Sequence, residues 1–136
     1  MPADAASNPD AKQQWYSYAV VRVVPHVDRG EFINVGVVLF ARTMHYLDAR
    51  VELNPARLHL LAPDLDIEDV QRHLDVFRRI AAGDTDAGPI AQLSQSERFH
   101  WLTSPRSTVI QTSEVHEGRC HRPEEAIEEL LVHLVR

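Results

Sequence analysis

The stretch from residue 30 to residue 41 constrains the fold most, because it is almost entirely apolar. From Phe32 onward only Asn34 and Gly36 interrupt the apolar run. A short run that is rich in Val and Ile and follows a turn signal is typical of a strand covered on both faces. In an unbulged strand Asn34 and Gly36 point to the same side, since they lie two residues apart. We therefore expect a buried central strand that carries one polar position.

The neighbouring strands are also visible in the sequence. Residues 16–24 combine β-branched and aromatic side chains, which favours a strand. Asp28 and Gly30 then suit a hairpin turn. Residues 46–53 alternate apolar and polar side chains, as a strand with one dry and one wet face does. These segments predict an antiparallel meander with residues 32–41 in the middle.

A long amphipathic helix is predicted in the middle of the chain. Its apolar stripe recurs at spacings of three and four residues and consists of Ile67, Val70, Leu74, Phe77 and Ala81. Asp64 or Asp66 is expected to cap this helix, and Gly83 to end it. Residues 54–63 predict a connector with a short helical turn, and residues 89–93 a short second helix.

The last third of the chain predicts two strands and a helix. Residues 97–103 and 107–115 are interpreted as strands joined by a turn. The terminal segment begins with Pro123 and two acidic residues, and its apolar face consists of Ile127, Leu130, Leu131, Leu134 and Val135. The predicted fold is α+β, an antiparallel sheet of about five strands with two main helices packed on it, in the order β-β-β-α-(α)-β-β-α. We expect residues 1–14 to be a disordered tail and residues 15–136 a single domain.

Composition narrows the classes of function. The chain has 14 basic and 20 acidic residues and a formal charge of −6, which argues against an unaided electrostatic grip on nucleic acid. Its single cysteine, Cys120, excludes an internal disulfide and fits a reducing compartment. The sequence contains no apolar run near the roughly 18 residues that span a membrane and no signal-peptide pattern at its start. We therefore expect a cytoplasmic protein.

Four polar residues are candidates for an active site at one edge of the sheet: Glu31, Asn34, His100 and Arg106. Arg106 would hold an anion, and Glu31 or His100 would move a proton. Glu31 borders the central strand and could pair with an arginine such as Arg22 or Arg106. The alternative for Asn34 is structural, and we favour it: a buried amide needs hydrogen-bond partners, while Gly36 admits a close backbone or a large aromatic ring.

Histidine is the one functional residue type that is frequent, with eight copies. His116, Cys120 and His121 are weak candidates for a metal site, because adjacent side chains in an extended segment point apart. His26, Asp28 and Glu31 share the first hairpin connection and could do acid–base work or hold a divalent ion. We favour a turn-forming role for Asp28.

Other recurrent motifs are missing from the sequence. It has neither a Gly-x-Ser-x-Gly elbow nor a phosphate-binding glycine loop, so no cofactor is expected. An aromatic–basic surface for a peptide or single-stranded nucleic acid is conceivable, formed by Arg98, Phe99, Trp101, Arg106 and Gln111. Because Phe99 and Trp101 have the same parity on the predicted strand, we favour a joint role for them in the core.

Two segments together resemble a known family. They are Gly-Glu-Phe-Ile-Asn-Val-Gly-Val-Val-Leu at 30–39 and Phe-His-Trp-Leu-Thr-Ser-Pro-Arg-Ser-Thr-Val-Ile-Gln-Thr-Ser at 99–113. The chain is similar, from about Tyr16 to Val135, to the small bacterial family named domain of unknown function 3037. The resemblance implies a partner protein, such as a HipA-like kinase, and brings no catalytic or binding residue with it.

Three hypotheses follow from these observations. The favoured one is a non-catalytic protein-interaction or regulatory module that acts with a partner protein or as a homo-oligomer. The second is an unrecognised enzyme with an acid, His and Arg site at the sheet edge. The third, which the net charge disfavours, is a nucleic-acid-binding module.

Overall fold

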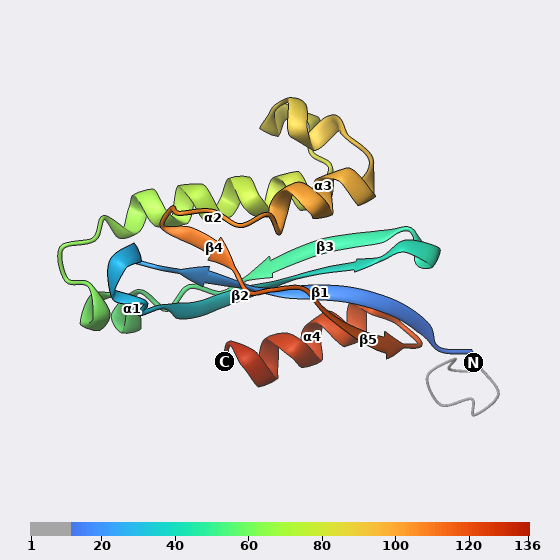
Figure 1. Ribbon diagram of the computed structural model, residues 1–136, viewed down its shortest axis with the longest axis horizontal. Coiled ribbons are helices and arrows are strands. Elements are labelled where there is room, and N and C mark those ends of the chain that lie inside the picture. Colours follow the sequence, from blue (N-terminus) through green and yellow to red (C-terminus); the bar gives the residue numbers. More distant parts are fainter. Residues whose placement is uncertain (1–11) are drawn as a thin grey trace.

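The computed structural model describes residues 12–136. It has three layers: a twisted antiparallel sheet, two helices that cover one face, and one helix that covers the other (Figure 1). The strands are β1 (Gln14–Val23), β2 (Ile33–Ala41), β3 (Tyr46–Val51), β4 (Ile110–Thr112) and β5 (His116–Cys120). The helices are α1 (Pro55–Leu61), α2 (Ile67–Ala82), α3 (Gln95–Leu102) and α4 (Pro123–Leu134). The predicted α+β fold with a five-stranded antiparallel sheet is confirmed.

The predicted meander is also confirmed. The strand order is β3-β2-β1, and β1 pairs on its other side with both β4 and β5. Strand β2 is central and is buried from Val35 to its end. Val38 and Phe40 belong to the core below α2, whereas Val37 and Leu39 belong to the core against α4. Burial on both faces explains why this strand shows no polar alternation.

A β-bulge at Val35 changes the predicted orientation of Asn34. Val21 lies opposite Gly36, but Arg22 lies opposite Asn34, so Val35 is an extra residue in β2. Val35 therefore joins the α2-side core, and Asn34 turns to the α4 side, where it donates to Leu134. Gly36 keeps the parity of Val38 on the α2 side. The two interruptions of the apolar run thus lie on opposite faces.

The two long helices form as their patterns predict. The side chain of Asp66 caps α2 by accepting from the Asp69 amide, and Gly83 ends the helix in the left-handed conformation. Four of the five predicted stripe residues of α2 are buried, namely Val70, Leu74, Phe77 and Ala81. In α4 the side chains of Ile127 and Leu131 are buried against β2. Asn54 caps α1, so the predicted helical turn in the connector is a helix of its own.

Residues 97–103 are not a strand, and this part of the prediction was wrong. They form most of α3, which begins with a capping box: the Glu97 amide donates to Ser94 Oγ at 3.2 Å, and the Ser94 amide donates to the Glu97 carboxylate at 3.3 Å. This reciprocal cap satisfies amide groups that the first helical turn leaves unpaired. It stabilises a helix despite the aromatic residues that favoured a strand.

The strand predicted over 107–115 is shorter, and a further strand follows it. Only Ile110–Thr112 pairs with β1, and pairing resumes at His116. Between these pairs β1 contributes two residues and the opposite chain three, which makes a second bulge. Ser113 fills it: its hydroxyl accepts from the Val20 amide at 2.9 Å and donates to the Glu114 carbonyl.

The remaining predicted elements are placed as follows. The predicted short helix at 89–93 is a 3₁₀ helix, Pro89–Gln92. Of the predicted tail, residues 1–11 lie outside the described residues, and β1 already begins at Gln14. None of the helices in residues 12–136 is long and apolar enough to cross a membrane.

Candidate functional site

The four predicted active-site residues do not meet. His100, Arg106 and Asn34 each border a different pocket. Asn34 faces α4 across the sheet from α3, which carries His100. Side chains on opposite faces of a sheet cannot act on one substrate atom.

Glu31 and Arg22 are not partners. Glu31 pairs with Arg29 in the same exposed connection, Oε1 to Nε 3.2 Å. The Arg22 guanidinium instead donates to Asn34 Oδ1 at 3.3 Å and lies 4.0 Å from the centre of the Phe32 ring. Asp28 lies in the 3₁₀ turn Val27–Arg29 of the hairpin connection, and His26 and Asp28 are exposed.

The weak metal candidates are also separated. His116 and Cys120 stand at the two ends of β5, and four residues of strand span about 13 Å. Cys120 is buried against α4, and burial raises the pKa of its thiol. Within residues 12–136 the structure contains no group of three or more His, Cys, Asp or Glu side chains that could hold a metal ion.

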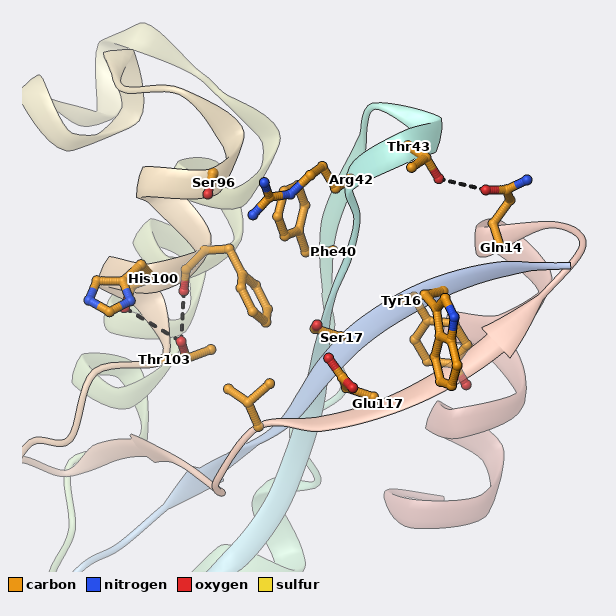
Figure 2. A pocket seen from close by; sticks show the side chains of 13 residues that line it. Gln14, Tyr16, Ser17, Phe40, Arg42, Thr43, Ser96, His100, Thr103 and Glu117 are labelled. Carbon is orange, nitrogen blue, oxygen red and sulfur yellow. Dashed lines mark hydrogen bonds between the residues drawn. The ribbon is translucent and has the colours of Figure 1, made fainter.

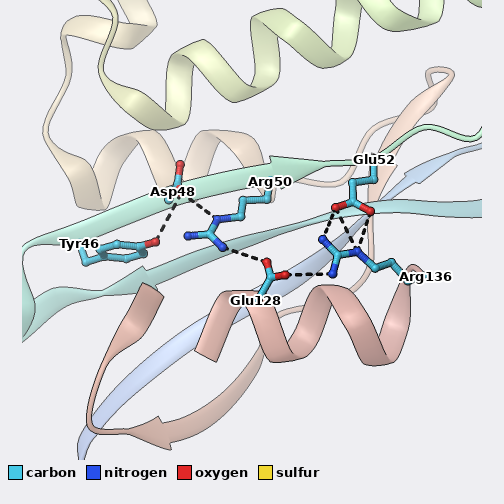
Figure 3. Close-up of polar contacts among 6 residues, drawn as sticks. All are labelled: Tyr46, Asp48, Arg50, Glu52, Glu128 and Arg136. Carbon is cyan, nitrogen blue, oxygen red and sulfur yellow. Dashed lines mark hydrogen bonds and ion pairs between the residues drawn. The ribbon is translucent and has the colours of Figure 1, made fainter. Parts of the chain in front are cut away.

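A polar cluster between β3 and α4 is structural, since its charged members satisfy one another (Figure 3). Arg50 bridges Asp48 and Glu128, with Nη1 3.1 Å from the Glu128 carboxylate. Arg136 bridges Glu128 and Glu52, at 2.9 Å and 2.6 Å. The Arg136 hydrogen bond keeps the pKa of Glu52 below its ordinary value. This chain of ion pairs fastens the end of α4 to β3.

Tyr46 stands at the other end of that cluster. Its hydroxyl donates to Asp48 at 3.4 Å. Burial, and then the nearby Asp48 carboxylate, raise the pKa of Tyr46 from 10.0 to about 12. The phenol is therefore a neutral donor at physiological pH.

A largely apolar concavity lies between α2 and the segment that leads into β4. We call it the α2 groove; its cavity volume is about 530 Å³, within the range of ligand-binding pockets. Buried Val70, Phe77 and Ile80 line it from α2. Val76 and Trp101 also line it and expose 42% and 38% of their surface. A groove with a buried apolar wall and two solvent-accessible apolar side chains suits an apolar ligand.

Trp101 is held in place by Arg106. The Arg106 guanidinium carbon lies 4.2 Å from the centre of the indole ring, and its two terminal nitrogens donate to the carbonyls of Trp101 and Leu102 at the end of α3. Burial lowers the pKa of Arg106. The arginine thus caps α3 and stacks on the ring at once, which orders an aromatic side chain before any ligand arrives.

The expected joint core role of Phe99 and Trp101 was wrong. On a helix, residues two apart do not share a face. Phe99 is buried and packs against Phe40, with ring centres 5.4 Å apart, while Trp101 lines the groove. The alternative prediction was an aromatic–basic surface that includes these residues. That surface is only partly exposed, because Arg98 is buried as well as Phe99.

A second, more polar concavity of about 560 Å³ lies on the α3 side of the sheet (Figure 2). We call it the β5 cleft. Its walls are α3, the 3₁₀ turn Arg42–Met44, and the paired strands β1 and β5. His100 borders the cleft, but its ring turns away from Ser17 and Glu117 in Figure 2. An acid–histidine pair for proton transfer is therefore not formed here.

The sequence alone pointed to Trp101 and Arg106 as part of a possible aromatic–basic surface, but it did not single out Val76, Arg42 or Glu117. Val76 had a detectable signal, since it is an apolar residue outside the apolar stripe of α2. Arg42 and Glu117 had none, because they come from distant parts of the chain and line one cleft only through the fold.

The comparisons with known proteins give a family without an activity. A family model described as protein of unknown function (DUF3037) matches residues 18–135. No curated protein and no solved structure matches the chain.

Proposed function

The chain belongs to the DUF3037 family, and from its own surfaces we propose that it is a non-catalytic protein-interaction module that binds a partner protein through the α2 groove. The observation that carries the proposal is the half-exposed Trp101, stacked by Arg106 beside the exposed Val76. Tryptophan and arginine are the residues most enriched among those that dominate binding energy at protein interfaces. A pre-ordered ring also loses little conformational entropy on binding.

The charges around the groove define the chemistry of the occupant. Asp66 and Asp69 line the groove beside the first turn of α2. Asp69 is paired only with Arg72 and His73 of the same exposed helix surface, and such pairs contribute little and are easily exchanged. We therefore assign as occupant an amphipathic segment of another protein, with apolar side chains for the groove and a basic residue for the two aspartates.

The absence of a converging acid–base or metal cluster in residues 12–136 leaves no specific observation in favour of an enzyme. The first partner class to test is the HipA-like kinases, which the family resemblance implies. In that arrangement the chain would act as a regulatory subunit in the cytoplasm.

The test uses the full chain as bait in lysate of its native host, followed by reconstitution of each captured pair from purified proteins. Val76→Glu places a charge at the rim of the groove and keeps a good helix former at an exposed position. Trp101→Ala removes the aromatic anchor. We expect each variant to bind the partner at least about tenfold more weakly, equivalent to 1.4 kcal/mol or more.

The matched control is Val132→Glu, the same substitution at an exposed position of α4 on the opposite face of the sheet. It should bind like the wild type. Circular dichroism and thermal unfolding establish that all three variants are folded. A partner that binds Val76→Glu and Trp101→Ala as tightly as the wild type would reject the α2 groove as the interface.

A further inference from the structure

The β5 cleft exists because the sheet is longer than the helical layer above it. α2 and α3 cover the part of the sheet that contains Ala19 and Val21, and both of these residues are fully buried. At the beginning of β1 the residues of the same face are Trp15 and Ser17, and Trp15 is exposed. Polar and aromatic side chains therefore replace the aliphatic core at this end.

One wall of the cleft carries an unusual arginine. Of the 13 arginines in the sequence, Arg42 is the one whose side chain has no hydrogen bond, ion pair or ring contact with any other residue of the described chain. In Figure 2 its side chain extends from the end of β2 toward Ser96 on α3. A free guanidinium in a cleft offers its fork of donors to a carboxylate or phosphate.

The opposite wall carries a free carboxylate. Glu117 of β5 lies directly across from Ser17 of β1 in the strand register, and Figure 2 shows the two side chains close together. Neither side chain has a hydrogen-bond partner among residues 12–136. Together they offer acceptor oxygens to an ammonium group.

Between the two walls the cleft is aromatic. Phe40, Phe99 and Trp15 line it, and the guanidinium carbon of Arg119 lies 5.1 Å from the centre of the Trp15 ring. The volume of about 560 Å³ exceeds that needed by a single small ion and suits an organic ligand.

We propose that the β5 cleft binds short zwitterionic peptides, with the terminal carboxylate on Arg42, the terminal ammonium at Glu117 and Ser17, and an apolar side chain over Phe40 and Phe99. A phosphate ligand would use Arg42 alone and be repelled by Glu117, whereas a ligand with both charges uses both walls. This site is separate from the α2 groove, and no residue lines both.

The probe is the tripeptide alanyl-phenylalanyl-alanine, titrated into the isotope-labelled full chain and followed by amide chemical shifts. We expect saturable shifts at residues of the cleft, such as Ser17, Arg42 and Glu117. Amidation of the peptide's carboxyl end and acetylation of its amino end each remove one charge. Each should weaken binding to the wild type roughly tenfold, as expected for loss of a charge-assisted hydrogen bond.

Two variants test which wall of the cleft binds each terminal charge of the peptide. Arg42→Ala should bind the free and the amidated peptide equally, and Glu117→Gln should bind the free and the acetylated peptide equally. Both positions are exposed and unpaired, so both variants should remain folded. Arg78→Ala and Glu124→Gln change exposed charges elsewhere and should behave as the wild type does.

Two results would overturn the proposal. One is the absence of shifts at millimolar tripeptide in the folded wild type. The other is equal binding of the free, amidated and acetylated peptides, which would mean that the cleft contacts only the apolar side chain. Val76→Glu should leave peptide binding unchanged, so failure of the α2 groove and failure of the β5 cleft are distinguishable.

Discussion

The side-chain amide of Asn34 donates a hydrogen bond to the main-chain carbonyl of Leu134, 3.2 Å away and 100 positions later in the chain. The same side chain accepts from Arg22. Asn34 thus joins β1, β2 and the last turn of α4, where carbonyl groups lack helical partners. The geometry supports the structural interpretation of this residue.

Replacement of Asn34 by Leu should destabilise the protein by about 1–2 kcal/mol, because both partly buried partners lose a hydrogen bond. Urea unfolding with an unchanged slope measures the loss. Partner binding through the α2 groove should be unaffected, since Asn34 lies on the other face of the sheet. Loss of binding in a stable variant would assign Asn34 a functional role instead.

Gly36 and Gly118 provide a matched pair of strand glycines. A Cβ at Gly36 would lie 2.5 Å from the carbonyl oxygen of Arg50, so the β2 and β3 backbones would have to separate. A Cβ at Gly118 would lie 2.6 Å from the end of the Tyr16 side chain, which can rotate away. We expect Gly36→Ala to cost roughly 1–3 kcal/mol and Gly118→Ala clearly less. Equal losses in chemical denaturation would contradict this account of Gly36.

At the bulge, the Val20 amide donates its hydrogen bond to the hydroxyl of Ser113 instead of to a main-chain carbonyl. Ser113→Ala leaves that buried N–H without an acceptor, which should cost about 1–3 kcal/mol. Hydrogen exchange at Val20 should accelerate in the variant more than at Val38 in the central pair. Ser107→Ala, at an exposed position nearby, should change stability by less than about 0.5 kcal/mol.

Tyr46 makes stability depend on pH in the alkaline range. Its pKa is about 12 in the folded protein and 10.0 when unperturbed. Below pH 10 the phenol is neutral in both states, and its contribution to stability is complete. From pH 10 to about 12 only the unfolded chain ionises at this position, so that contribution is lost as the pH rises. The Tyr46→Phe variant should lose less stability than the wild type over this pH window. In a titration followed by tyrosinate absorbance, the variant should lack the tyrosine that ionises last.

Periodicity predicted those elements that bury a whole face. The central position of β2, the stripe of α2 and the terminal helix follow from apolar patterns within single segments. The strand predicted for residues 97–103 was wrong. Aromatic residues at alternate positions favoured a strand, but Ser94 and Glu97 form a capping box that starts a helix there. The hydrogen bonds of the capping box at the start of this segment therefore favour a helix over a strand.

The candidate sites were less predictable for a different reason. The bulges at Val35 and Ser113 depend on which strand pairs with which, and a bulge changes the side to which later residues point. The α2 groove depends on α3 being a helix, which separates Trp101 from Phe99. Arg42 and Glu117 become neighbours of one cleft only after β5 returns along β1.

The bulge at Ser113 also affects whether the edge of the sheet can pair with other copies of the protein. An unpaired strand edge is a template for polymerisation, and the danger grows with the length of straight, regular backbone that it presents. Here the outer edge beside β1 is divided into β4 and β5, of three and five residues, offset by one residue from each other. A straight incoming strand can match the hydrogen-bonding groups of one piece but not of both, so the broken edge protects the protein against stacking into fibres.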